Sequence, residues 1–115
     1  MNDKELLELA AKAAGMDAIV WTSGAWTFGE KTECRPGSAD IWNPLTDDGD
    51  ALRLALRLEM TLRPYTSLSR AKYCEVELEH EGRQLLLTEK VSTTLEEATR
   101  RAIVRAAAAI GEQMK

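Results

Sequence analysis

The stretch WNPLTDDGDALRLALRLEMTL, residues 42–62, decides the fold of this chain. Apolar residues at every even position from Leu52 to Leu62 alternate with polar or small ones, which is the period of a half-buried strand. However, Ala, Leu, Arg, Glu and Met favour helix, and the apolar run that starts at Ala51 has no β-branched residue before Thr61. Asp47 or Asp48 suits the N-cap of a helix, and Asp50 suits its first turn. We therefore predict a helix through this apolar run.

The same stretch, with its Trp-Asn-Pro turn, acidic step and Ala/Leu-rich run, resembles a family of small bacteriophage and prophage proteins, the phage ABA sandwich domain. Members also carry an alanine-rich helix near the C-terminus, matched here by EATRRAIVRAA at residues 97–107. The resemblance covers both motifs and the helix before them, and so most of the chain. It implies a helix–sheet–helix architecture and a viral origin, but no catalytic or binding residues.

Size and composition fit one globular domain spanning residues 1–115. The 44% hydrophobic and 30% charged residues are ordinary for a soluble domain. No apolar run approaches the roughly 20 residues of a membrane span, and the N-terminal residues lack the basic flank and apolar core of a signal peptide. We expect a cytoplasmic protein, and the resemblance implies a bacterial host.

The other elements complete an α+β fold, an antiparallel β-sheet with α-helices packed on it, in the order α-β-β-α-β-β-α. Helices are predicted from about Lys4 to Ala14, stopped by Gly15, and from Thr93 or Thr94 to near Gly111. Strands are predicted at 19–22 and 25–28 around Ser23-Gly24, and at 73–79 and 84–88 around Glu81-Gly82. Residues 29–41 and 63–69 are expected to be loops.

Metal or nucleophilic chemistry is not predicted, and no cofactor is expected. Asp47-Asp48-Gly49-Asp50 lacks the ligand spacing of a calcium loop, so helix capping explains these acids better. Cys34, Cys74 and His80 lack the paired spacing of a zinc site, and nothing marks either thiol as activated. In a reducing compartment both cysteines are expected as free thiols.

Five arginines on the second and third helices could form a basic patch if those helices are neighbours. They are Arg53, Arg57, Arg100, Arg101 and Arg105. The alternative is that they coat solvent-facing helix surfaces and pair with acids such as Asp50 and Glu97. The net charge is −4, with residues 1–50 carrying 4 basic and 10 acidic side chains. Duplex DNA is therefore an improbable partner.

The three tryptophans, Trp21, Trp26 and Trp42, lie close together in sequence. A two-residue hairpin loop would place Trp21 opposite Trp26, where an aromatic pair stabilises a sheet. We expect Trp42 to be core, held by Pro44, and at least one of the other two to mark an interaction surface. The sequence thus favours a non-enzymatic phage or prophage accessory protein acting by protein–protein interaction or self-association. A nucleic-acid-associated protein using the arginine patch is the alternative.

Overall fold

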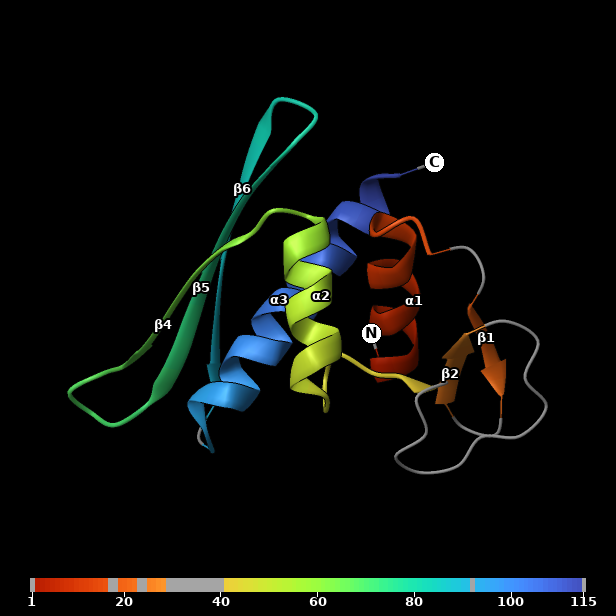
Figure 1. Ribbon diagram of the computed structural model, residues 1–115. Helices are drawn as coiled ribbons and strands as arrows, with labels where there is room; N and C mark the ends of the chain where they lie inside the picture. The colour runs from red at the N-terminus through yellow and green to blue at the C-terminus, as the bar shows by residue number, and fades with distance from the viewer. Residues whose placement is uncertain (1, 17–18, 23–24, 29–40, 92, 115) are drawn as a thin grey trace.

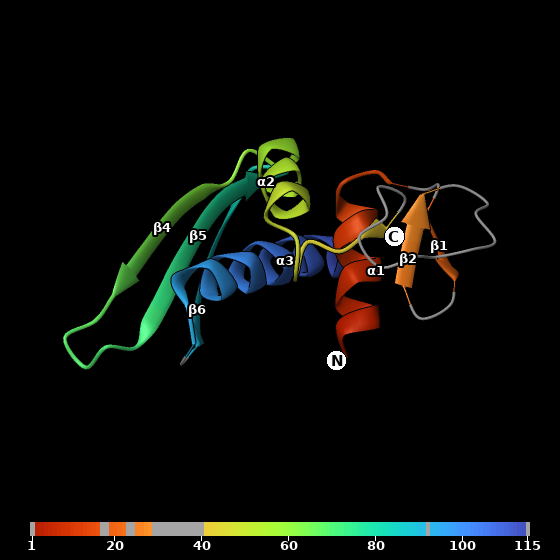
Figure 2. The ribbon, with the colours of Figure 1, turned by 60° about the horizontal axis from the view of Figure 1, so that its bottom comes forward.

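The computed structural model describes residues 2–16, 19–22, 25–28, 41–91 and 93–114. It shows an α+β fold, as predicted from the sequence. Two antiparallel three-stranded sheets lie at opposite ends of the molecule, in the orders β1-β2-β3 and β4-β5-β6. The helices α1, α2 and α3 lie between them (Figures 1 and 2). The expected loop turn at Ser23-Gly24, most of the expected loop 29–41 and Cys34 lie outside the described residues.

Helix α1 (Asp3–Ala13) begins and ends as predicted. The side chain of Asn2 accepts a hydrogen bond from the backbone N–H of Glu5 at 2.9 Å, which satisfies a donor of the first turn. At the other end Gly15 has φ +72°, and the next residue, Met16, donates its N–H to the Ala11 carbonyl at 2.9 Å. This is the glycine-terminated Schellman motif that the sequence indicates.

Helix α2 (Asp48–Arg57) ends earlier than predicted. Its N-cap is Asp47, which accepts from the Asp50 N–H at 2.7 Å. Its C-terminus is also a Schellman motif: Glu59 N–H bonds the Leu56 carbonyl and Met60 N–H bonds the Ala55 carbonyl. The residue in the left-handed conformation is Glu59, with φ +53°, instead of the usual glycine. The stop signal was therefore missing from the sequence, and the prediction of a helix through Leu62 was wrong.

Residues predicted as the end of that helix and a loop form strand β4 (Thr61–Thr66), paired with β5 (Lys72–His80). Strand β6 (Arg83–Val91) pairs with the other edge of β5. The hairpin turn is Glu81-Gly82, both with positive φ, as a two-residue type I′ turn requires. Cys74, Val76 and Leu78 of β5 are buried, whereas the acids between them face away, as the alternating pattern predicted.

Helix α3 (Leu95–Gln113) is the centre of the molecule and has a hydrophobic cluster on each side. One cluster joins it to the sheet through Val76 and Cys74 of β5. The other joins it to α1 and α2 through Ile103, Val104 and Ala107. Because two faces of α3 are covered, more of the helix is buried than the single stripe expected from its sequence. The helix also continues past Gly111, which was predicted to end it.

The small sheet brings the three tryptophan positions into one row. Strands β1 (Ile19–Thr22) and β2 (Ala25–Phe28) pair with Trp21 opposite Trp26, which confirms the predicted register. Strand β3 (Ile41–Trp42), which was not predicted, pairs with β2 so that Trp42 lies opposite Trp26. The hairpin and the segment before α2 are thus parts of one sheet.

Candidate functional site

A groove of about 370 Å³ lies between α2, β4 and α3. Its lining is mostly apolar, and these three elements can be followed in Figure 2. The lining residues come from all three elements: Ala51, Leu52, Leu62, Pro64, Leu95, Ile103, Thr99, Asp48, Glu96 and Arg100. An apolar concavity with a few polar groups is the usual form of a binding site.

Helix α2 supplies an exposed apolar ridge beside this groove. Its buried face is formed by Ala51, Leu54 and Ala55, because these residues point at α1, α3 and the tryptophans. Leu52 and Leu56 lie off that face, one turn apart, and their exposed fractions are 55% and 67%. Exposed leucines next to an apolar groove extend its apolar surface. A contiguous apolar patch indicates an interaction site, whereas isolated exposed leucines do not.

The polar end of the groove is organised by Arg100. Its Nε donates to the Leu45 carbonyl at 2.9 Å and its Nη1 donates to the Asp48 carboxylate at 2.6 Å. These bonds connect α3 to the start of α2. Asp48 is therefore an ion-pair partner, while Asp47 is the cap. Asp50 is buried, accepting from the Asn43 N–H at 2.9 Å and from Arg53 at 2.7 Å.

The five arginines do not act as one free basic patch in this structure. Arg53 and Arg100 pair with acids at the start of α2. Arg101 and Arg105 both face Glu89 on β6, at 3.6 and 2.6 Å. These pairings follow the alternative considered from the sequence, in which helix arginines are neutralised by neighbouring acids.

Arg57 is the exception among the five arginines. It is exposed in the last turn of α2, and no ion pair reaches it from the described part of the chain. A single exposed arginine next to a helix C-terminus interacts favourably with the helix dipole. Alone it is too little for a nucleic-acid surface, which requires several phosphate contacts.

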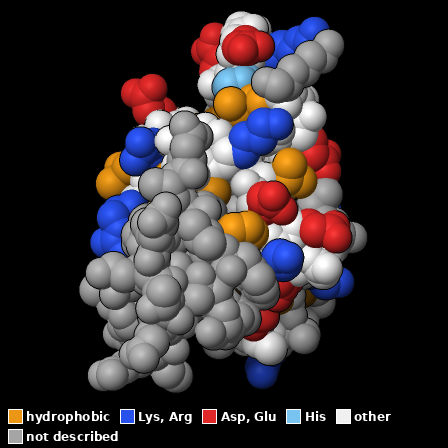
Figure 3. All heavy atoms as spheres, turned by 90° about the vertical axis from the view of Figure 1, so that its right-hand side faces the viewer, with side chains coloured by type: hydrophobic (Ala, Val, Ile, Leu, Met, Phe, Trp, Pro, Cys, Tyr) orange, Lys and Arg blue, Asp and Glu red, His pale blue; other side chains and the backbone are white. Residues whose placement is uncertain are grey.

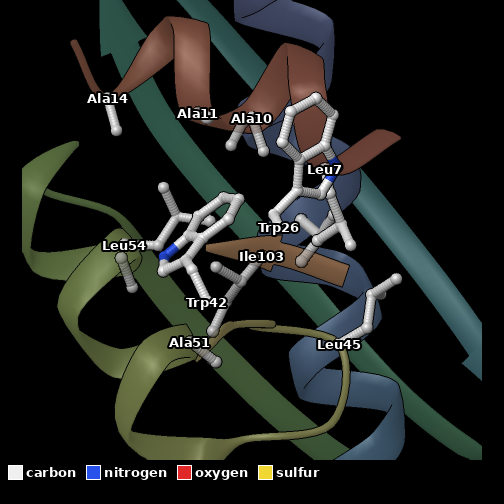
Figure 4. Close-up of a cluster of buried hydrophobic side chains, with 13 residues drawn as sticks. Leu7, Ala10, Ala11, Ala14, Trp26, Trp42, Leu45, Ala51, Leu54 and Ile103 are labelled. Atoms are coloured by element: carbon white, nitrogen blue, oxygen red, sulfur yellow. The ribbon is translucent and has the colours of Figure 1, made fainter. Parts of the chain in front are cut away.

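Two of the tryptophans are core residues. Trp42 is 3% exposed and lies against Ala51 and Leu54 of α2 (Figure 4), so it is a core residue, as expected; Pro44, two residues further on, is fully buried as well. Trp26 is 8% exposed, lies beside Leu7 of α1, and its Nε1 donates to the Lys4 carbonyl at 3.3 Å. Trp26 is therefore not available as an interaction surface in this structure. The side chain of Trp21 is not among those the structure describes, so its role in an interaction surface stays a prediction.

The outer face of the large sheet carries charges that neutralise one another. Arg63 of β4 donates to Glu75 and Glu77 of β5, both at 3.1 Å. The hydrogen bond to Glu75, which is the largest cause, and the hydrogen bond to Glu77 raise the pKa of the Arg63 guanidinium above its usual value. Further along, Tyr65 stacks on Tyr73 with ring centroids 5.1 Å apart. This face of the sheet is a solvated surface on which the two tyrosine rings stack on each other.

Neither Cys74 nor His80 has the surroundings of a catalytic group. Cys74 is buried, and burial raises the pKa of its thiol, the opposite of what an activated nucleophile requires. His80 Nε2 lies 3.8 Å from the carboxylate of exposed Glu81 in the hairpin. Within the described ranges, no group of three or more His, Cys, Asp or Glu side chains could hold a metal ion.

The groove was not predicted from the sequence, because strand β4 was not predicted. Leu62 and Pro64 were assigned to a helix end and a loop, so no wall opposite α2 was expected. The signals that could have found it are Thr61, the first β-branched residue of the run, and the strict alternation from Leu52 to Leu62. A proline inside a strand is typical of a sheet edge, which is where β4 lies.

Comparison with protein families, curated proteins and solved structures finds no match for this chain. Among the residues the structure describes, no helix is long and apolar enough to cross a membrane. Figure 3 shows one face of the molecule, on which acidic and basic side chains of the described residues are interspersed. The described part of that face shows no single-sign patch that would steer a charged partner.

Proposed function

We propose that this chain is a non-enzymatic accessory protein that acts by binding another protein or a second copy of itself through the groove. The phage or prophage origin implied by the sequence resemblance is part of this proposal. One observation carries it: Leu52 lines an apolar groove and is 55% exposed, and Leu56, one turn further along α2, is 67% exposed. Burying that surface against a partner is favourable by about 25 cal/mol per Å² of apolar area.

The alternative function, nucleic-acid binding through the arginines, is supported less well. Four of the five side chains are engaged with carboxylates. Phosphate contacts would have to compete with those ion pairs, and the chain carries a net charge of −4. Similarly, the buried thiol of Cys74 and the surroundings of His80 give no support to an enzymatic role.

The test is capture from bacterial lysate with three immobilised proteins: wild type, a Leu52→Gln/Leu56→Gln double variant, and Leu86→Gln. Leu86 is the matched control because it is 64% exposed, but on β6, away from the groove lining. Glutamine is a good helix former and similar in size to leucine, so α2 should remain folded. Sedimentation of the same three proteins measures self-association.

Groove-dependent binding is expected in one of these two measurements. A protein captured by wild type and Leu86→Gln, but lost in the double variant, would identify an external partner. A dimer lost only in the double variant would identify self-association. If capture and sedimentation are the same for all three proteins, and circular dichroism shows all three folded, the groove is not the functional surface.

A further inference from the structure

We propose that two copies of this chain pair through the free edge of β6, so that their large sheets join into one antiparallel sheet. This surface is separate from the groove, whose walls are α2, β4 and α3. Strand β6 has 9 residues and forms the edge of its sheet opposite β4. A long strand edge with unpaired backbone groups is a template for another strand.

The outward backbone groups of β6 follow from its hairpin. The turn is Glu81-Gly82, so the pair that closes it, His80 and Arg83, is hydrogen-bonded. Hydrogen-bonded pairs alternate along an antiparallel ladder, so the odd-numbered residues of β6 bond β5. The backbone N–H and C=O groups of the even-numbered residues point away from the sheet: Gln84, Leu86, Thr88 and Lys90. From the described part of the chain, no backbone hydrogen bond reaches this edge.

The two edges of the large sheet differ in how they are protected. On β4 the same alternation directs the even-numbered residues outward, and one of them is Pro64, which has no N–H to donate. Strand β6, all of which is described, has no proline and no positive φ, and its register with β5 is uninterrupted. Pairing of β6 with β4 of another copy would continue into a fibre, and Pro64 opposes it. Pairing of β6 with β6 closes a two-fold dimer.

One register of this pairing uses the whole edge. With the two-fold axis at Leu87, Gln84 of one copy lies opposite Lys90 of the other, and Leu86 lies opposite Thr88. All four outward residues then form hydrogen-bonded pairs, with two bonds in each pair. An axis at Leu86 would leave Lys90 without a partner in β6, and an axis at Thr88 would leave Gln84 without one.

The same register brings together opposite charges that are not used within one copy. Glu79 of β5 is exposed and lies beside Gln84 on the outer face of the sheet. No ion pair reaches Glu79 or Lys90 from the described residues; Lys90 Nζ lies 5.9 Å from the centre of the Tyr73 ring. Gln84 donates to Glu77 at 3.2 Å, which leaves Glu79 open. Lys90, opposite Gln84 of the other copy, is then two strands, about 10 Å of backbone separation, from Glu79 and within side-chain reach.

Apolar side chains near the axis are covered on both faces of the joined sheet. On the outer face Leu86, which is 64% exposed, lies opposite Thr88 and diagonally next to Leu86 of the other copy. On the inner face Leu87 meets Leu87 of the other copy at the axis. A hollow of about 310 Å³ beside Leu87, lined also by Leu6 of α1 and Ala108 of α3, leaves room for this second leucine.

Sedimentation equilibrium of the full chain measures the dimer. A contact between two strand edges is small, so a dissociation constant on the order of 10 μM is expected, which concentrations from about 1 μM to 1 mM cover. Thr88→Pro removes an outward N–H that β5 does not use, and should raise the dissociation constant at least tenfold. Thr66→Pro is the matched control, because Thr66 is exposed and points outward from the β4 edge, and should leave the constant unchanged. Leu86→Gln keeps the backbone donors and should weaken the dimer far less than Thr88→Pro.

The charge pair gives a test that does not depend on proline. Lys90→Glu should raise the dissociation constant about threefold or more, because it places a carboxylate near Glu79. Adding Glu79→Lys should restore the wild-type value, since the swapped charges again attract each other. The effect of Lys90→Glu alone should shrink at high salt. Circular dichroism checks that every variant is folded.

Oxidative cross-linking tests the register. In a Cys34→Ser background, Leu87→Cys should form a disulfide-linked dimer faster than Leu86→Cys or Thr88→Cys, because position 87 lies on the two-fold axis. Faster linking at 86 or 88 would overturn the proposed pairing.

A monomer at all concentrations would also overturn the inference, as would a dimer insensitive to Thr88→Pro and Lys90→Glu. A monomer that captures a lysate protein only while Thr88 is intact would mean that the edge takes a strand of another protein, and the second copy would be rejected. The dimer should persist in the Leu52→Gln/Leu56→Gln variant, whose β6 edge is intact. Failure of this inference and failure of the groove proposal are therefore distinguishable.

Discussion

Gly111 of α3 lies directly against the backbone of Leu9 in α1. A Cβ built on Gly111 would lie 2.1 Å from the Leu9 carbonyl oxygen and 2.8 Å from its carbonyl carbon. Backbone atoms are held in place by the α1 hydrogen bonds, so they cannot turn aside as a side chain does. The buried Ala10 and Ala107 extend the same contact between small residues. The two helices therefore approach each other as closely as their backbones allow.

Gly111→Ala should destabilise the protein by about 2–3 kcal/mol, the cost of overpacking a close contact. Alanine is normally preferred over glycine inside a helix by about 1 kcal/mol, so the sign of the effect is diagnostic. Urea denaturation of wild type and variant measures it. A variant as stable as wild type would mean that α1 and α3 lie further apart than the structure shows.

Gly49→Ala in α2 is the matched control. A Cβ there would lie 3.2 Å from the Arg53 guanidinium and from Asp47 Oδ2, the oxygen that caps the helix, so these side-chain ends need to shift by only a few tenths of an ångström. The helix preference for alanine should then prevail, with a gain of up to about 1 kcal/mol. Opposite signs for the two glycines would show that the loss at Gly111 is steric.

Most of the fold could be predicted from local signals, since the α+β class, α1, the β5–β6 hairpin and the Trp21–Trp26 register follow from caps, turns and alternation. The errors lie where tertiary contacts override the local pattern. Gly111 was interpreted as a stop because glycine usually ends a helix, but here the close approach of α1 requires it. The end of α2 was missed because a glutamate occupies the position where glycine is usual.

Glu59→Gly should stabilise the protein by about 1 kcal/mol. Glu59 has φ +53°, a left-handed conformation that costs an L-residue roughly 1–2 kcal/mol. Glycine removes this strain and keeps the Schellman hydrogen bonds, which involve only the backbone. Glu8→Gly, on the exposed face of α1, should instead cost up to about 1 kcal/mol. Thermal melts of both variants check this, and a loss of stability in Glu59→Gly would contradict the assigned helix end.

The groove itself could not be predicted from the sequence, for a physical reason. Its walls come from three elements, and Leu62 and Pro64 face α3 only because β4 begins right after the turn at Glu59. The pairing of arginines was foreseen as an alternative, but the partner Glu89 was not. That carboxylate belongs to a strand whose inward face is otherwise apolar.

The buried thiol of Cys74 should make stability decrease at alkaline pH. Burial raises the pKa of Cys74, so the folded chain keeps the proton that the unfolded chain releases above about pH 8.5. Unfolding is therefore favoured as the pH rises from there toward the folded pKa. In a Cys34→Ser background, the free energy of unfolding is measured with Cys74 present and in the Cys74→Ala variant. The difference between the two should be constant below pH 8. Above pH 8 it should change in favour of the alanine variant. A gap independent of pH up to 10 would mean the thiol is not protected.

Glu89 and its two arginines should show an asymmetric response to mutation. Glu89 is 8% exposed, whereas the side chains of Arg101 and Arg105 are 33% and 49% exposed. Glu89→Gln leaves two guanidinium groups that can turn to water, so a cost of about 1 kcal/mol is expected. Arg101→Met with Arg105→Met keeps the aliphatic stems but leaves a buried carboxylate without its ion pairs, for which about 3 kcal/mol is expected. Adding Glu89→Gln to that double variant should then recover part of the loss, as urea denaturation would show. If the arginine variants cost no more than Glu89→Gln, Glu89 is solvated and the ion pairs contribute little.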